Sequence, residues 1–79
     1  NRALRLSVDC IVTDISPYRK VFESHNIHLS TYFLQYDYTA NTTDINFVVL
    51  APSHRNYLPM FEDLRAINPT RSLTLTSQA

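Results

Sequence analysis

The sequence predicts an α+β domain in which strands and helices follow the order β-α-β-β-α-β, with a four-stranded antiparallel sheet. Three observations predict this class. Apolar residues alternate with polar ones in short runs, which is the period of a half-buried strand. Two segments with helical spacing separate these runs, and the first of them carries Pro17, which suits the first turn of a helix. With 79 residues, the chain has room for one such domain.

The opening segment predicts a strand followed by a helix. Residues 4–12 alternate, so every second side chain falls on the same, apolar face of a strand. Asp14 or Ser16 can cap the helix that follows, and Pro17 suits its first turn. Asn26 is expected to end this helix with a positive φ, a role that glycine often has.

The middle of the chain predicts a hairpin. Residues 27–38 are rich in aromatic and β-branched residues, as strands are, and we expect uninterrupted alternation along them. Residues 39–43 form the turn, in which Asn41 can take a positive φ. Residues 44–51 then form the third strand. The expected faces of the second strand are Ile27, Leu29, Thr31 and Phe33 on one side, and Tyr32, Leu34, Tyr36 and Tyr38 on the other.

The last part of the chain predicts a helix and a strand. Residues 52–67 carry an apolar stripe at helical spacing. Because Pro59 cannot lie deep inside a helix, either the regular helix starts near Asn56 or Ser53 caps a looser first turn. Residues 71–77 form the fourth strand. The packing that keeps the connections short and the crossovers right-handed has the strand order 4-1-3-2 and both helices on one face, which is the ferredoxin-like arrangement. The predicted core contains Leu6, Val8, Cys10, Phe22, Phe33, Phe47, Val49, Phe61 and Leu64.

The composition excludes several classes of function. Seven basic and seven acidic residues give a net charge of zero, without the basic excess that binds nucleic acids or acidic membranes. The chain has no glycine, which excludes a P-loop and a dinucleotide fingerprint, because both need glycine where the backbone approaches phosphate. No apolar run reaches the length of a membrane span, and no signal peptide is visible. We therefore predict no nucleic-acid partner.

The candidate catalytic and metal-binding residues have ordinary structural interpretations. His25 and His28 have a spacing that can supply two metal ligands, but no carboxylate or second cysteine beside them completes a zinc site. Cys10 continues the apolar alternation of the first strand, where a packed thiol is expected rather than a nucleophile. The sequence thus predicts no metal, no cofactor and no catalytic residue. An enzyme with a metal centre at the two histidines remains an alternative.

The sheet face opposite the helices is predicted to be a partner surface. With uninterrupted alternation, this face presents apolar side chains on two neighbouring strands, and an exposed apolar patch is typical of an interaction site. The alternative is a half-exposed sheet with scattered apolar residues. The predicted partner surface consists of Tyr32, Leu34, Tyr36, Val48 and Leu50.

Residues 13–29 resemble the segment of ACT-type regulatory domains that carries a D-x-P-G turn, a short helix and an N-I strand entry. The glycine with which those domains admit a ligand backbone is replaced here by Ser16 or Tyr18. The resemblance implies, as an alternative function, a domain that senses a small molecule such as an amino acid at a dimer interface. The implied ligand site contains Asp14, Ser16, Pro17 and Ile27.

In length and element spacing, the whole chain is similar to the cytosolic C-terminal ACT-like domain of the MgtC/SapB family of bacterial inner-membrane proteins. The similarity implies that residues 1–79 form a single ACT-like domain of a longer membrane protein linked to magnesium limitation or virulence. It implies a non-catalytic regulatory or protein-interaction role on the cytoplasmic side of the inner membrane. The expected partner is a second copy or the remainder of the parent protein.

Overall fold

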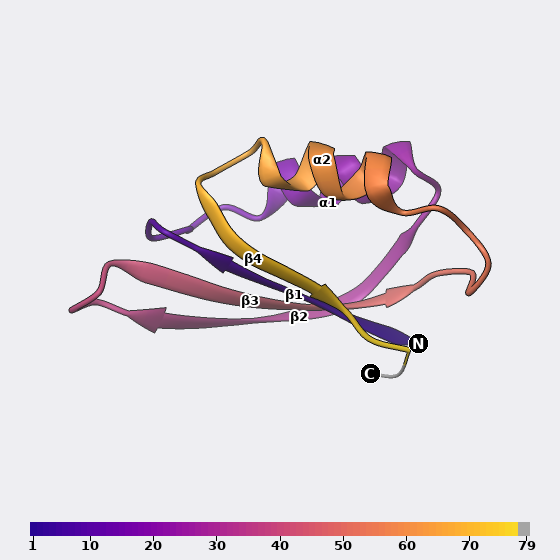
Figure 1. Ribbon diagram of the computed structural model, residues 1–79. Coiled ribbons are helices and arrows are strands. Elements are labelled where there is room, and N and C mark those ends of the chain that lie inside the picture. Colours follow the sequence, from indigo (N-terminus) through magenta and orange to yellow (C-terminus); the bar gives the residue numbers. More distant parts are fainter. Residues whose placement is uncertain (78–79) are drawn as a thin grey trace.

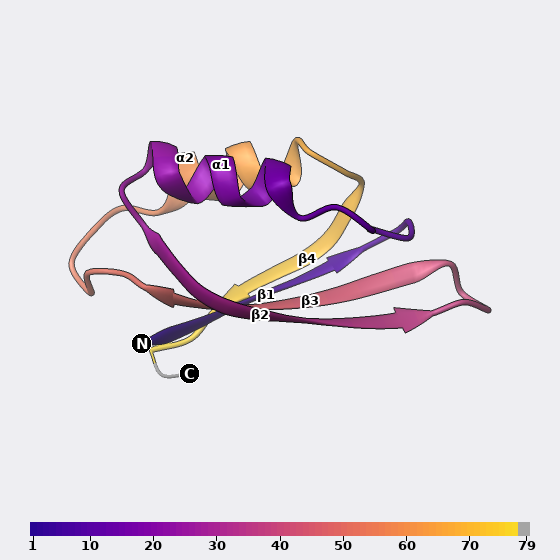
Figure 2. The same cartoon turned by 180° about the vertical axis from the view of Figure 1, so that it is seen from behind.

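The computed structural model describes residues 1–77 and has the predicted order of elements. The strands are β1 (Arg2–Val8), β2 (His28–Asp37), β3 (Thr42–Leu50) and β4 (Thr70–Leu75), and the helices are α1 (Ser16–Ser24) and α2 (Leu58–Arg65). The strands form one antiparallel sheet in the order β2-β3-β1-β4, which is the predicted order counted from the other edge. Both helices cover the same face of the sheet (Figures 1 and 2). The fold is therefore ferredoxin-like, as predicted.

Two asparagines end elements in the conformation that glycine usually supplies. Asn26, directly after α1, and Asn41, in the β2–β3 turn, both have a φ of 59°. Asparagine tolerates this left-handed region better than most residues, because its short polar side chain bonds locally. Beyond Asn26, the N–H of Ile27 donates to the carbonyl of Phe22 at 2.9 Å, which closes the end of the helix. Both positive φ values were predicted.

Both helices carry a proline in the first turn. At α1 the N-cap position is Ile15, and Asp14 acts from one residue further out by accepting the N–H of Ser16 at 2.9 Å. At α2 the side chain of Asn56 accepts the N–H of Leu58 at 3.1 Å, so the regular helix starts close to Asn56. Local side-chain acceptors thus set both helix starts.

The core lies between the sheet and the two helices. At its centre, the fully buried ring of Phe47 makes an edge-on contact with Phe22, at 4.9 Å between centroids, and a tilted contact with Tyr18 at 5.7 Å. Six of the nine predicted core residues are buried, and Cys10 and Phe61 are partly buried against them. The buried six are Leu6, Val8, Phe22, Phe47, Val49 and Leu64.

The placement of Phe33 in the core is wrong, because β2 contains a β-bulge. Leu29 pairs with Val49, but Thr31 pairs with the next residue of β3, Val48. One extra residue, Ser30, therefore lies in β2 and reverses the alternation of every side chain that follows. Phe33 consequently points away from the helices and is 60 % exposed.

Among residues 1–77, neither helix is long and apolar enough to cross a membrane.

Candidate functional site on the open face of the sheet

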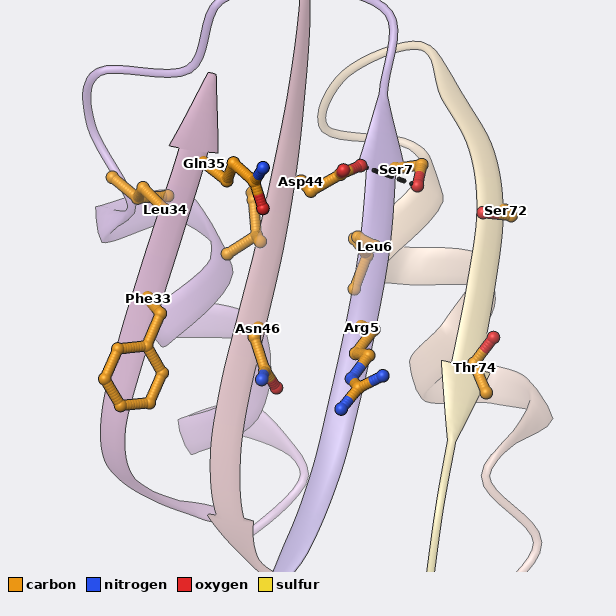
Figure 3. Close-up of a pocket in the computed structure, with 11 residues that line it drawn as sticks. Arg5, Leu6, Ser7, Phe33, Leu34, Gln35, Asp44, Asn46, Ser72 and Thr74 are labelled. Atoms are coloured by element: carbon orange, nitrogen blue, oxygen red, sulfur yellow. Dashed lines mark hydrogen bonds between the residues drawn. The ribbon is translucent and has the colours of Figure 1, made fainter. Parts of the chain in front are cut away.

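The open face of the sheet, which neither helix covers, carries mainly polar side chains arranged in rows across the strands. Cross-strand pairing aligns the residues of each row, and paired residues present their side chains to the same face. The first row, from β2 to β4, is Phe33, Asn46, Arg5 and Thr74, and the second row is Gln35, Asp44, Ser7 and Ser72. Figure 3 shows these eight side chains on one side of the strands.

These two rows line a hollow of about 650 Å³, which we call the polar hollow. In Figure 3, the side chains of Leu6 and Leu34 point the other way, toward the helix layer, so these two residues line the hollow through their backbones. Since the residues come from all four strands, the register of the sheet determines the shape of the hollow. A volume of this size is typical of sites that bind small molecules.

The two charged groups of the polar hollow differ in how they are satisfied. The carboxylate of Asp44 accepts a hydrogen bond from the hydroxyl of Ser7 at 2.8 Å. The guanidinium of Arg5 is exposed and makes no side-chain hydrogen bond or ion pair among residues 1–77. In Figure 3, it points away from Asp44, along β1. The hollow therefore contains a cation whose donors are free for an anion.

Asn46, at the floor of the hollow, has an unsatisfied acceptor. Its Oδ1 atom is buried and has no hydrogen-bond partner. Leaving a buried acceptor unpaired costs about 1–3 kcal/mol, and most buried polar atoms in proteins are paired. Because Asn46 pairs with Arg5 on one side and Phe33 on the other, the unpaired atom lies between a cation and an aromatic ring.

Next to the polar hollow lies a smaller group of exposed apolar side chains, which we call the apolar strip. It consists of Phe33, Val48 and Leu50. Phe33 is 60 % exposed and Leu50 is 48 % exposed. Val48 is two residues from Leu50 on β3 and lies diagonally opposite Phe33 on β2. The ring of Phe33 lies along the sheet with one face turned outward (Figure 3). Phe33 thus belongs to the edge of the polar hollow and to the apolar strip.

The five residues predicted as one partner surface do not share a face, so that prediction is wrong in its geometry. Because of the bulge, Tyr32, Leu34 and Tyr36 pair with core residues of β3 and face the helix layer, whereas Val48 and Leu50 lie on the open face. Leu34 packs against the core, and the hydroxyl of Tyr36 donates to the carbonyl of Val12 at 2.6 Å.

A signal for this change of face is present in the sequence. The apolar positions of this strand change from odd numbers at Leu29 to even numbers at Tyr32, Leu34 and Tyr36, across the polar residues between them. Phe33, the remaining apolar residue, then belongs to the opposite face. Arg5 lies between Leu4 and Leu6 in the alternating run, so the pattern predicts it on the polar face of the first strand, but no local signal marks it as a binding residue.

The four residues of the alternative ligand site lie at the two ends of α1. Asp14, Ser16 and Pro17 are exposed at its start, whereas Ile27 follows its other end and is buried. The nine residues of the helix span about 13 Å. Hydrogen bonds from the backbone and side chain of Ser16 lower the pKa of the Asp14 carboxyl. Within one chain these four residues do not form one site.

His25 and His28 lie in different surroundings. The Nε2 atom of His25 lies 2.8 Å from a carboxylate oxygen of Asp63 on α2, and Arg55 donates to the backbone carbonyl of His25 at 2.7 Å. His28 is exposed at the start of β2. Within the described range, 1–77, no three histidine, cysteine or acidic side chains are grouped to hold a metal ion.

Comparison with known proteins identifies a structural likeness. No family model and no curated protein matches the sequence. The crystal structure of protein BT0572 from Bacteroides thetaiotaomicron is similar to this chain, with a TM-score of 0.59 and 15 % sequence identity. The similarity covers 95 % of this chain but 46 % of that protein, so the chain spans less than half of its length. At this identity, the likeness shows the shared fold.

Proposed function

We propose that the chain is a non-catalytic regulatory domain that binds another protein surface through the open face of its sheet. The observation that carries the proposal is the apolar strip, in which the exposed ring of Phe33 lies beside Val48 and the half-exposed Leu50. Contiguous apolar side chains on an uncovered face are typical of protein-interaction sites, and aromatic side chains are enriched in such sites.

The resemblance to the MgtC/SapB family supplies the setting of this proposal. The domain would act on the cytoplasmic side of the bacterial inner membrane, as part of a membrane protein linked to magnesium limitation or virulence. Its partner would be a second copy of the domain or the remainder of the parent protein. The domain would regulate by docking and releasing this surface rather than by catalysis.

The size of the open face limits the strength of such an interaction. The strands have 7, 10, 9 and 6 residues. With strands about 4.8 Å apart and a rise of about 3.3 Å per residue, they give a footprint of roughly 500 Å². A stable protein interface buries about 800 Å² on each partner. Burial of Phe33 would contribute about 1.5–3 kcal/mol, and Val48 and Leu50 would add less because they are already partly covered. We therefore expect weak, concentration-dependent association.

Sedimentation velocity over a concentration series tests the proposal, with the chain alone and with the full-length protein. Phe33→Lys and Val48→Lys should each weaken association, because each places a charge in the apolar strip. Leu58→Lys is the matched control, since Leu58 is 64 % exposed on the helix layer. If the two open-face variants associate as strongly as the parent in both forms of the protein, the proposal fails.

A further inference from the structure

We propose that the polar hollow binds a small molecule in which a planar ring is joined to a carboxylate or phosphate by a segment that carries an N–H or O–H donor. This inference goes beyond the proposed protein interaction and does not depend on it. It rests on three neighbouring side chains that lie side by side in the first row of the open face and each leave one chemical requirement unmet. These are Phe33, Asn46 and Arg5.

The first requirement is an anion for Arg5. Its guanidinium is exposed and has no side-chain partner among residues 1–77, and the nearby carboxylate of Asp44 is already bonded to Ser7. A guanidinium presents parallel N–H donors that match the two oxygens of a carboxylate or phosphate. The hydroxyl of Thr74, which is paired with Arg5 across the sheet, adds a further polar group beside the bound anion.

The second requirement is a donor for Asn46. Its Oδ1 atom is buried without a partner at the floor of the hollow. A ligand with an N–H or O–H group above this atom would satisfy it in a desolvated place, where a hydrogen bond is stronger than in water. A bare inorganic anion such as phosphate lacks the ring and the linking segment with its donor, so it would meet one requirement of the three.

The third requirement is a planar group that stacks on the exposed ring of Phe33. This ring presents one face to solvent at the edge of the hollow (Figure 3). Planar rings stack on such exposed aromatic faces largely irrespective of their identity. Since neighbouring strands lie about 4.8 Å apart, Phe33 and Arg5 start about 10 Å apart, with Asn46 between them. A ligand would therefore present its ring, its donor and its anionic group in this order across the sheet.

This chemistry has two common sources. In a nucleoside monophosphate, the base stacks, a ribose hydroxyl between the base and the phosphate donates, and the phosphate is the anionic group. In an aromatic amino acid, the ring stacks, the ammonium group donates and the carboxylate is the anion. Both are small enough for a hollow of about 650 Å³. The experiment must therefore include both.

The test is a titration of the isotope-labelled chain followed by amide NMR shifts. One arm uses adenosine monophosphate and the other uses tryptophan, with adenosine and inorganic phosphate as incomplete ligands. We expect one complete ligand to give saturable shifts centred on residues 5, 33 and 46. We expect each incomplete ligand to bind at least about tenfold more weakly than the complete ligand, because it lacks the ring or the anionic group.

Variants assign the interaction to the three side chains. Arg5→Gln should weaken binding of the complete ligand about tenfold or more, because it removes the positive charge. Arg5→Lys should weaken binding less, because the charge stays and only the paired N–H donors are lost. Asn46→Ala and Phe33→Leu should each weaken it as well. Arg19→Gln is the matched control, since this exposed arginine lies on α1 in the helix layer.

Each contrary outcome overturns the inference. The inference fails if neither arm gives saturable shifts. It also fails if Arg5→Gln leaves binding unchanged. It fails as well if adenosine or phosphate binds as tightly as the complete ligand. Val48→Lys separates this inference from the proposed function, since Val48 lies outside the polar hollow. That variant should lose protein association and keep ligand binding, so each proposal can fail without the other.

Discussion

Thr43 attaches the segment that follows β1 to the sheet. This residue is fully buried in β3, and its hydroxyl donates to the carbonyl of Cys10 at 2.7 Å while it accepts the N–H of Val12 at 3.0 Å. The segment between β1 and α1 has no regular structure, so these bonds replace the pairing that a strand would provide. One side chain thus satisfies two backbone groups that would otherwise lack partners.

Thr43→Val should lower the free energy of unfolding by about 1–3 kcal/mol, because it keeps the shape of the side chain but leaves the two backbone groups unpaired. Thr43→Ser, which keeps the hydroxyl, is the control and should be less destabilising. Urea denaturation of the three proteins measures the difference. Equal stability of the valine and serine variants would show that the hydroxyl contributes nothing.

At the scale of the elements, the bulge in β2 decides which aromatic residues stabilise the fold and which are free to bind. Leu29, before the bulge, and Leu34, after the bulge, both face the core. In a regular strand, two residues an odd number of positions apart would lie on opposite faces. Without the extra residue, Phe33 would point toward the helices and Leu34 would point to solvent. The bulge therefore places an exposed ring on the open face.

Alanine substitution at two adjacent residues tests this assignment. Leu34→Ala should lower the free energy of unfolding by about 1–3 kcal/mol, less than for a fully buried leucine, since Leu34 is partly buried against the core. Phe33→Ala should change it by less than about 0.5 kcal/mol, as is usual at exposed positions. Thermal or chemical denaturation measures both. The reverse ranking would place Phe33 in the core and contradict the observed register.

Local sequence signals predicted most of the fold, whereas the candidate site depends on register. The first-turn position of Pro17 and the positive φ of Asn26 and Asn41 follow from the chemistry of single residues, and the structure confirms them. Of the two helix starts that Pro59 left open, the structure has the one near Asn56.

Strict alternation predicted the faces of β1 and β3 correctly, although β1 ends at Val8 and not at residue 12. It failed in β2, because one inserted residue moves every later side chain to the opposite face. The unpaired Oδ1 atom of Asn46 depends on neighbours from other strands, which no local pattern specifies.

At the scale of the whole molecule, the two faces of the sheet carry different kinds of side chain. The helix-covered face contains the large buried side chains, and the open face contains the polar hollow and the apolar strip. Figures 1 and 2 show that both helices lie on the same face of the sheet, so neither helix covers the open face. Substitutions on the open face should therefore change binding while leaving stability nearly unaffected.

Phe47→Ala tests whether the stability of the molecule resides on the covered face. Phe47 is fully buried and contacts Phe22 and Tyr18 on α1, so its removal leaves a cavity between the sheet and this helix. The change should lower the free energy of unfolding by about 3–5 kcal/mol. That is a large part of the total for a small domain, since native proteins are stable by about 5–15 kcal/mol.

The melting temperature of the Phe47→Ala variant should accordingly fall by at least about 12 °C, because 1 kcal/mol corresponds to about 4–8 °C in a domain of this size. Phe33→Ala is the matched control, since it removes the same ring from the other face of the sheet and should leave the melting temperature within a few degrees of the parent. Circular dichroism on heating measures both. A Phe47→Ala variant that melts together with the Phe33→Ala control would mean that the core does not depend on this ring.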